Sequence, residues 1–175
     1  MYAVSSVARR LVGLVSLLAS VLWVTASGAA ELQAPSGPPL LTIEGRISNT
    51  NVGDTAQFDR EMLESLGMES FTTTTPWFTG ATEFEGVPMA KLMELVGAEG
   101  TVIEAVALND YRTEVPIADF ETYGTILALK RDGAYMPIRD KGPLFIVYDY
   151  DSATELQSQD FYSRSVWQLA RIVVK

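Results

Sequence analysis

The chain of 175 residues contains no cysteine and no histidine. Without cysteine it cannot form a disulfide, a thiolate metal site or an iron–sulfur cluster, and it has no thiol nucleophile. Without histidine it lacks an imidazole base, a histidine-activated nucleophile and the commonest metal ligand in proteins. These two absences exclude most enzyme classes that depend on an activated nucleophile or a metal centre.

Positive charge is also scarce, since 13 basic residues stand against 22 acidic ones. A strongly acidic surface opposes binding to nucleic acid or to an anionic membrane by bulk charge. An anionic ligand would therefore need a local basic pocket that works against the overall field.

The beginning of the chain has the order of a secretory signal peptide. Arg9 and Arg10 precede an apolar run over residues 11–25, and the small residues 26–30 follow it. The run of about 15 residues is shorter than the roughly 20 that a spanning helix needs. We therefore predict a signal peptide at residues 1–30, cut near Ala29 or Ala30, with an uncleaved anchor as the alternative. Both export routes, the general secretory route and the twin-arginine route, stay open as alternatives.

The predicted mature chain has the length of one domain. Its formal charge is −11 instead of −9, because the leader holds two basic and no acidic residues. Residues 31–39, rich in proline, glycine and serine, are expected to form a flexible leader before a domain at residues 40–175. We predict strands at residues 40–46, 71–75, 101–108, 124–131, 134–138 and 144–148, and a final strand within residues 165–174. Helices are predicted at residues 60–66 and 88–96, which gives an α+β domain with mixed β-sheets and short helices.

Three stretches are more specific than ordinary strand ends. They are TTTTPW at residues 72–77 with EFEGVP at 83–88, ALNDY at 107–111 before Val115-Pro116, and MPIRDKGPL at 136–144. In this order and spacing they resemble the sulfite-oxidase-type fold of the oxidoreductase molybdopterin-binding domain family. The shared features are Gly-Val-Pro before an amphipathic helix, an aromatic turn before Val-Pro, and Gly-Pro-Leu entering an apolar strand. The resemblance covers roughly residues 41–175.

The chain departs from that family at the metal ligand. In catalytic members the loop before the tryptophan carries a cysteine that ligates molybdenum, whereas this chain has only threonines there, up to Thr75. A neutral hydroxyl is a poor soft ligand. The resemblance therefore implies a pterin cleft without molybdenum, and molybdopterin is not the expected cofactor.

A pterin is a flat bicycle with many hydrogen-bonding groups, best held by aromatic faces, polar side chains and backbone groups. Trp77 and Tyr111 are candidates for stacking, and Asn109 and Asp110 for pairing with the ring edge. Arg139 and Lys141 are candidates for binding ligand oxygens. The predicted ligand-binding residues are Thr75, Trp77, Asn109, Asp110, Tyr111, Arg139, Lys141 and Gly142.

Each candidate also has a purely structural interpretation. Trp77 can be a half-buried core aromatic, Asn109 and Asp110 can form a turn, and Arg139 can pair with Asp140 or Asp110. Lys141 can be a solvated loop charge. We interpret Trp167 and Gln168 as packing residues, and the acidic run at residues 149–151 as a solvated turn.

The resemblance extends to small exported members of the fold that lack the molybdenum ligand, the PruR-type pterin-binding regulators. It implies a non-catalytic periplasmic protein that binds a pterin and acts on the periplasmic domain of a membrane signalling partner. Fold analogy does not establish function. Two alternatives stay open: a molybdopterin-dependent oxidoreductase with an unusual ligand set, and an interaction domain of the cell envelope with no ligand.

Overall fold

The structure is a computed structural model that describes residues 32–175. The predicted signal peptide and its cleavage site lie outside the described residues. The strands are β1 (Leu41–Gly45), β2 (Ala56–Phe58), β3 (Glu69–Thr75), β4 (Phe78–Pro88), β5 (Val102–Ala107), β6 (Arg112–Pro116), β7 (Ile126–Arg131), β8 (Ala134–Tyr135), β9 (Phe145–Val147) and β10 (Leu169–Val174). The helices are α1 (Arg60–Ser65), α2 (Met89–Leu95), α3 (Ala118–Thr122) and α4 (Gln159–Arg164), with 3-10 turns at Ile138–Asp140 and Thr154–Leu156. The predicted α+β class is confirmed.

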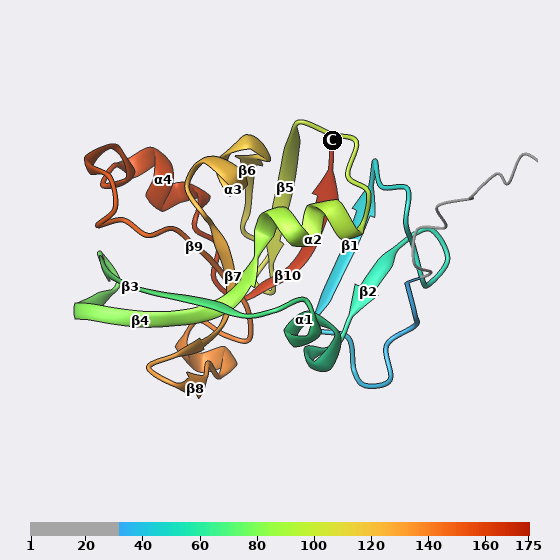
Figure 1. Ribbon diagram of the computed structural model, residues 1–175, viewed down its shortest axis with the longest axis horizontal. Coiled ribbons are helices and arrows are strands. Elements are labelled where there is room, and N and C mark those ends of the chain that lie inside the picture. The colour runs from blue at the N-terminus through green and yellow to red at the C-terminus, as the bar shows by residue number, and fades with distance from the viewer. Residues whose placement is uncertain (1–31) are drawn as a thin grey trace, which may run out of the picture.

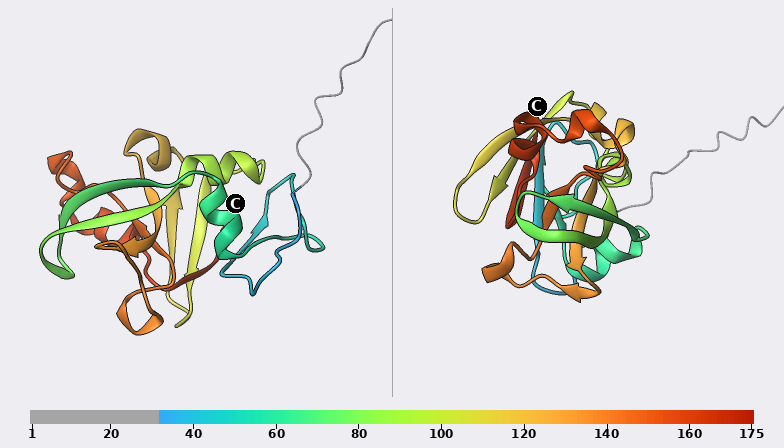
Figure 2. Two further views of the ribbon diagram at one scale, coloured as in Figure 1. Left: turned by 60° about the horizontal axis from the view of Figure 1, so that its bottom comes forward. Right: turned by 90° about the vertical axis from the view of Figure 1, so that its left-hand side faces the viewer.

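The strands form two sheets (Figure 1). The first has the order β2-β1-β10-β5-β6, in which β1 and β10 are parallel and the other pairs are antiparallel. The second has the order β3-β4-β7-β8, and β9 also pairs with β7. The long β3–β4 hairpin extends to the end of the molecule where α4 lies (Figures 1 and 2). This arrangement brings the hairpin tip close to the C-terminal third of the chain.

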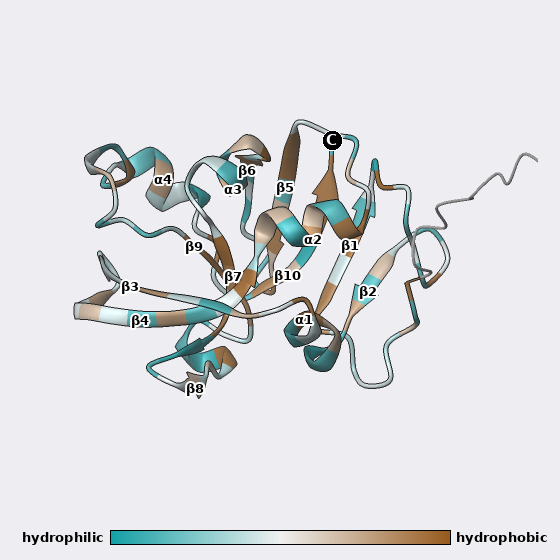
Figure 3. Ribbon diagram, in the orientation of Figure 1, coloured by the Kyte–Doolittle hydropathy of each residue, from teal (hydrophilic) through white to brown (hydrophobic). Residues whose placement is uncertain are grey.

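One cluster of buried apolar side chains joins the two sheets. It includes Ile43 and Ile172 from the first sheet and Phe84, Leu127 and Phe145 from the second, none of which is exposed. Hydrophobic positions are concentrated on β5, β7, β9 and β10 (Figure 3). Burial of this apolar surface is the main force that holds the sheets together.

Several predicted elements are confirmed with their end signals. Asp59 caps α1 by accepting a hydrogen bond from the Met62 amide at 3.0 Å, and Gly67 follows the helix with a φ of 90°. Asp132 and Gly133 connect β7 to β8 with φ angles of 50° and 76°, as a tight hairpin requires. Local capping and turn chemistry therefore determined these boundaries.

The strand β4 was not predicted, because its glycines and glutamates hide the alternating pattern. Within it Phe84 is buried between Glu83 and Glu85. Gly86 is needed where β4 meets β7, since a Cβ atom there would lie 2.1 Å from the Leu127 carbonyl oxygen. The short elements β2, β6, α3 and α4 were also not predicted.

The described part of the predicted leader runs along the domain without forming a helix or strand. Asn51 donates a hydrogen bond to the Gln33 carbonyl oxygen at 2.8 Å. The backbone amides of Ser36 and Gly37 donate to the Asp59 carboxylate at 2.9 and 2.8 Å. Among residues 32–175, no helix has both the length and the apolar character needed to cross a membrane.

Candidate functional site

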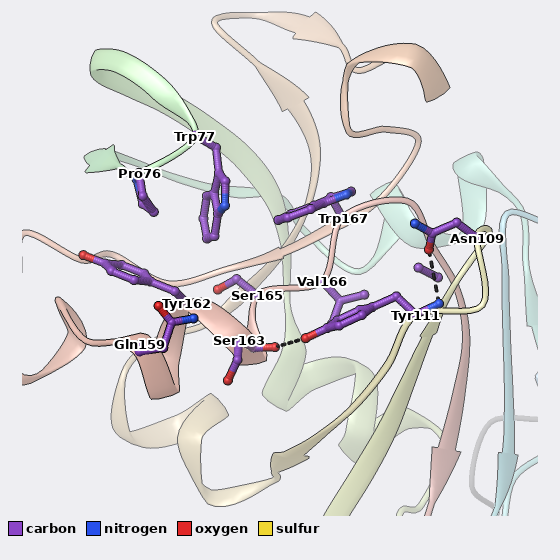
Figure 4. Close-up of a pocket in the computed structure, with 11 residues that line it drawn as sticks. Pro76, Trp77, Asn109, Tyr111, Gln159, Tyr162, Ser163, Ser165, Val166 and Trp167 are labelled. Atoms are coloured by element: carbon purple, nitrogen blue, oxygen red, sulfur yellow. Dashed lines mark hydrogen bonds between the residues drawn. The ribbon is translucent and has the colours of Figure 1, made fainter.

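A pocket of about 330 Å³ lies between the tip of the β3–β4 hairpin, the turn from β5 to β6, and α4 (Figure 4). Three separate chain segments contribute its walls, at residues 76–77, 107–111 and 159–167. The lining residues are Pro76, Trp77, Ala107, Asn109, Tyr111, Gln159, Tyr162, Ser163, Ser165, Val166 and Trp167. Three of the predicted ligand-binding residues, Trp77, Asn109 and Tyr111, therefore meet in one pocket.

Trp77 lies at the centre of an aromatic cluster beneath the pocket. Its ring makes edge contacts with Phe145 and Trp167 at 5.5 Å, with Tyr162 at 5.9 Å and with Tyr150 at 6.0 Å between centroids. Such edge-to-face pairs are favourable beyond the area they bury. Trp77 is thus a half-buried core aromatic that also lines the pocket, where its predicted stacking on a ligand stays a prediction.

Side-chain hydroxyl groups hold the hairpin tip in place. The Thr74 amide and hydroxyl donate hydrogen bonds to the Asp151 carboxylate at 2.7 and 2.6 Å, and the Asp151 amide donates to the Thr73 hydroxyl at 3.1 Å. The bonds from Thr74 hold the pKa of Asp151 below its ordinary value. Asp151 is therefore a structural anchor and not only part of a solvated turn.

The same bonds test whether this loop fits a molybdenum ion. The Thr75 hydroxyl oxygen accepts hydrogen bonds from the Trp77 and Phe78 amides at 3.3 and 3.2 Å, which closes the turn. The hydroxyls of Thr73, Thr74 and Thr75 thus all take part in local structure. No group of three or more acidic, cysteine or histidine side chains within residues 32–175 is placed to hold a metal ion. The residues present do not fit the metal centre of the molybdopterin family.

The turn between β5 and β6 forms the opposite wall of the pocket. The Asn109 side-chain oxygen accepts a hydrogen bond from the Tyr111 amide at 3.2 Å, and Asp110 has a φ of 64°. Asp110 does not line the pocket. The Tyr111 hydroxyl donates to the Ser163 carbonyl oxygen on α4 at 3.0 Å, so Tyr111 bridges two walls (Figure 4).

The third motif lies next to the pocket but does not line it. The Lys141 ammonium lies 4.0 Å from the centroid of the Trp167 ring, and burial lowers the pKa of Lys141. Arg139 is exposed and makes no ion pair with other residues of the described segment. Asp140 pairs instead with Arg131, with contacts of 3.0 and 2.7 Å. The structural alternative for Arg139, a pair with Asp140 or Asp110, is therefore absent from the described residues.

Gly142 is buried and has a structural role in the same loop. A Cβ atom at this position would lie 1.8 Å from the Met136 carbonyl oxygen. The loop is fixed further by Gln168, whose amide donates to the Lys141 carbonyl oxygen at 3.0 Å. The Gln168 side chain also donates to the Ile138 carbonyl oxygen at 2.7 Å. These contacts place Lys141 against Trp167.

A buried polar network holds α4, which supplies Gln159, Tyr162 and Ser163 to the pocket. Asp119 on α3, only 7% exposed, accepts hydrogen bonds from Arg164 and from the Tyr148 hydroxyl, both at 2.9 Å. The hydroxyls of Tyr150 and Ser165 are also hydrogen-bonded to each other. Burial raises the pKa values of Tyr148 and Tyr150, so both phenols stay neutral.

Sequence reasoning missed eight of the eleven residues that line the pocket. Gln159, Tyr162 and Ser163 lie on a short helix with no motif, and Trp167 was interpreted as a packing residue. A useful signal was the density of aromatic residues in this segment, where Phe161, Tyr162 and Trp167 occur within seven positions of the sequence. In the described structure Trp167 both packs against Trp77 and lines the pocket.

Neither the protein-family models nor the curated proteins compared with this sequence match it. The functional argument for this chain therefore depends on the chemistry of the pocket and on the sequence features described above.

Proposed function

We propose that the chain is a non-catalytic binding protein for a flat heteroaromatic ligand of the pterin class. The observation that carries this proposal is the pocket itself, where aromatic rings and uncharged polar groups face one space. Trp77, Trp167, Tyr111 and Tyr162 provide aromatic surface, and Asn109 and Gln159 provide primary amides. This combination suits a planar ring with donors and acceptors along its edge.

The amide groups have hydrogen-bonding capacity left for a ligand. Asn109 uses its side-chain oxygen for the Tyr111 amide, and its NH₂ group makes no hydrogen bond to other described residues. The Gln159 side chain is exposed at the pocket wall. A primary amide can donate to a ring nitrogen or carbonyl and accept from an amino group. Asn109 and Gln159 are our candidates for hydrogen bonding to the edge of the pterin ring.

The finer assignment to the sulfite-oxidase-like, molybdopterin-binding fold belongs to the same proposal. It is supported by the three sequence stretches: TTTTPW ends at the hairpin tip and ALNDY forms the β5–β6 turn, both of which line the pocket, and Lys141 of the third stretch lies against Trp167. We propose no redox step, because the chain has neither cysteine nor histidine and the threonine hydroxyls of the hairpin tip are used for structure.

The regulatory role also remains part of the proposal. We propose that the protein acts in the periplasm and that its pterin-bound form signals to the periplasmic domain of a membrane partner. This role is supported by the predicted signal peptide and by the resemblance to exported regulators of the fold. Tyr111 supplies a physical link, because it touches the pocket while 46% of its surface stays exposed.

The ligand and metal content of the protein, purified from the periplasm, tests this proposal. After denaturation, the released small molecules are examined for pterin fluorescence while the same sample is analysed for molybdenum. We expect fluorescent pterin without molybdenum. Stoichiometric molybdenum would overturn the proposal and restore the oxidoreductase. Protein with neither, and with no affinity for added reduced pterins, would favour the ligand-free interaction domain.

A further inference from the structure

Lys141 differs from the other basic residues of the described chain. Within residues 32–175, four basic side chains make no ion pair, namely Arg46, Arg60, Arg139 and Lys141. The first three are exposed, whereas Lys141 is half-buried. A charged group that is removed from water without a paired carboxylate is poorly stabilised. The Lys141 ammonium is therefore free to interact with a negative charge that the described residues do not supply.

The ammonium of Lys141 lies over a ring that belongs to the pocket wall. It is 4.0 Å from the centroid of Trp167 and 5.8 Å from that of Phe78. Among the other aromatic residues that line the pocket, none has a cation over its ring from residues 32–175. Trp167 is thus the one pocket ring whose electron distribution a neighbouring charge alters.

The Trp167 ring separates Lys141 from the pocket. Figure 4 shows the ring nearly edge-on, with one face toward Ser165 and Tyr111 on the opposite side of the pocket. Lys141 does not line this space, although it lies over the same ring. The ammonium therefore lies on the face of Trp167 that points away from the pocket.

The backbone of the loop fixes the position of this charge. Lys141 has a φ of 67° and Gln168 a φ of 54°, a region that long side chains rarely adopt. The Gln168 amide donates to the Lys141 carbonyl oxygen at 3.0 Å, which joins the two residues. Backbone conformations of this kind are common at ligand sites, where the surrounding structure holds them. Lys141 is thus held beside Trp167 before a ligand arrives.

We propose that the pocket prefers flat aromatic ligands that carry a negative charge, and that Lys141 sets this preference through the ring of Trp167. This inference rests on the proposed function and adds the charge of the ligand to it. The faces of an aromatic ring are negative, which attracts cations. A cation on one face offsets part of that negative potential, so the opposite face repels an anionic ligand less. Lys141 is then a positioning residue that does not touch the ligand.

The distances show how this preference arises in an acidic protein. A ring stacked about 3.5 Å from Trp167 would lie roughly 7.5 Å from the ammonium. That is within the screening length of about 8 Å at physiological salt, and the indole between them excludes water. No acidic side chain from residues 32–175 lines the pocket. The attraction to Lys141 therefore acts at short range, while salt screens the more distant acidic surface.

Two pterins of similar size test the preference by isothermal titration. One is a pterin carboxylate, and the other is the corresponding hydroxymethylpterin, which is neutral. We expect the natural protein to bind the carboxylate about tenfold more tightly. Lys141→Met keeps an apolar side chain of similar length and should remove most of this preference, with less than about a twofold change for the neutral pterin.

The matched controls separate charge from packing. Lys141→Arg keeps a cation that stacks on an aromatic ring and should keep the preference. Arg139→Gln removes the neighbouring exposed charge and should leave both affinities unchanged. If Lys141→Met weakens both pterins equally, Lys141 only supports the pocket and the proposal is overturned. Equal binding of the two pterins by the natural protein also overturns it.

A pair of ligands without a pterin ring distinguishes this inference from the proposed function. Indoleacetate and indole-ethanol are flat aromatic molecules that differ in the same way, one anionic and one neutral. If neither pterin binds but indoleacetate is preferred through Lys141, the pterin class is wrong and the charge preference stands. If the pterins bind without a preference, the proposed function stands and the charge preference fails. Binding of none of the four contradicts both.

Discussion

Trp77 connects the pocket to the core of the protein. Its ring contacts four other aromatic rings, yet it also lines the pocket. Pocket residues of this kind are rigid before a ligand arrives, which lowers the entropy lost on binding. For the same reason Trp77 is a poor site for testing ligand contacts, because its removal damages packing as well as binding.

Asn109 is a better test of ligand recognition. Asn109→Ala removes an amide that we expect to pair with the ring edge, so affinity for a reduced pterin should fall by about 1 kcal/mol, roughly fivefold in Kd. Isothermal titration measures the change. The control Arg139→Ala should leave the affinity unchanged, because Arg139 is exposed and does not line the pocket. An equal loss in both variants would contradict the assigned pocket.

Asp119 supports the pocket from below through Arg164 and Tyr148. Asp119→Asn removes the buried negative charge that pairs with Arg164, so the free energy of unfolding should fall by about 2 kcal/mol. Denaturant-induced unfolding measures this change in the free energy of unfolding. As the control, Arg171→Gln disrupts the more exposed pair with Glu44 and should cost less than about 0.5 kcal/mol. Similar losses would mean that the Asp119 pair is solvated.

Among the elements, the β3–β4 hairpin and α4 position most of the site. The hairpin carries Trp77 at its tip, and Asp151 ties that tip to the loop after β9. The helix α4 has six residues, too few for stability by itself, and depends on its contacts with α3. The pocket is therefore built by tertiary contacts and not by local propensity.

The Asp151 anchor has an expected pH dependence. Its pKa is lowered in the folded state below its ordinary value of 3.8, by hydrogen bonds from Thr74. Its stabilising effect should be complete above that value and lost as the pH falls through the lower folded pKa. Hydrogen exchange of the β3–β4 amides should accelerate in Asp151→Asn at neutral pH. The control is Asp160→Asn, which changes an exposed carboxylate on α4 and should leave the exchange unchanged. Unchanged exchange in Asp151→Asn would contradict the role of Asp151 as an anchor of the hairpin tip.

Elements that local residues specify could be predicted from the sequence, whereas elements that depend on distant contacts could not. The helix at Arg60 and the hairpin at Asp132–Gly133 could be predicted, because capping and turn residues act locally. The strand β4 and the helix α4 could not, because partners distant in sequence stabilise them. The same limit applies to the site. Trp77, Asn109 and Tyr111 had local motifs, whereas Tyr162 joined the pocket only through folding.

For the whole molecule, the absence of histidine determines the response to pH. Histidine is the only side chain whose ordinary pKa lies between pH 5 and 8. The carboxylates of Asp59, Glu104, Asp140 and Asp151 have pKa values lowered by hydrogen bonds or ion pairs. Their contribution to stability is present above their ordinary pKa values and lost in more acidic solution.

The free energy of unfolding should therefore be nearly constant from about pH 5.5 to 8 and fall below about pH 4. Denaturant unfolding at a series of pH values checks this. In Asp59→Asn the free energy of unfolding should fall less steeply below about pH 4, because the substitution removes one of the carboxylates whose pKa is lowered by folding. A marked step in stability near pH 6.5 would contradict the expectation.

Tryptophan fluorescence tests the central claim most directly, because both tryptophans outside the predicted signal peptide, Trp77 and Trp167, line the pocket. Ligand-free protein is titrated with a tetrahydropterin while the emission is recorded. The account predicts saturable quenching at a ratio of one ligand per chain, with a weaker affinity in Asn109→Ala. No saturable change up to about 1 mM ligand, which corresponds to a binding free energy of roughly −4 kcal/mol, would contradict pterin binding by this pocket.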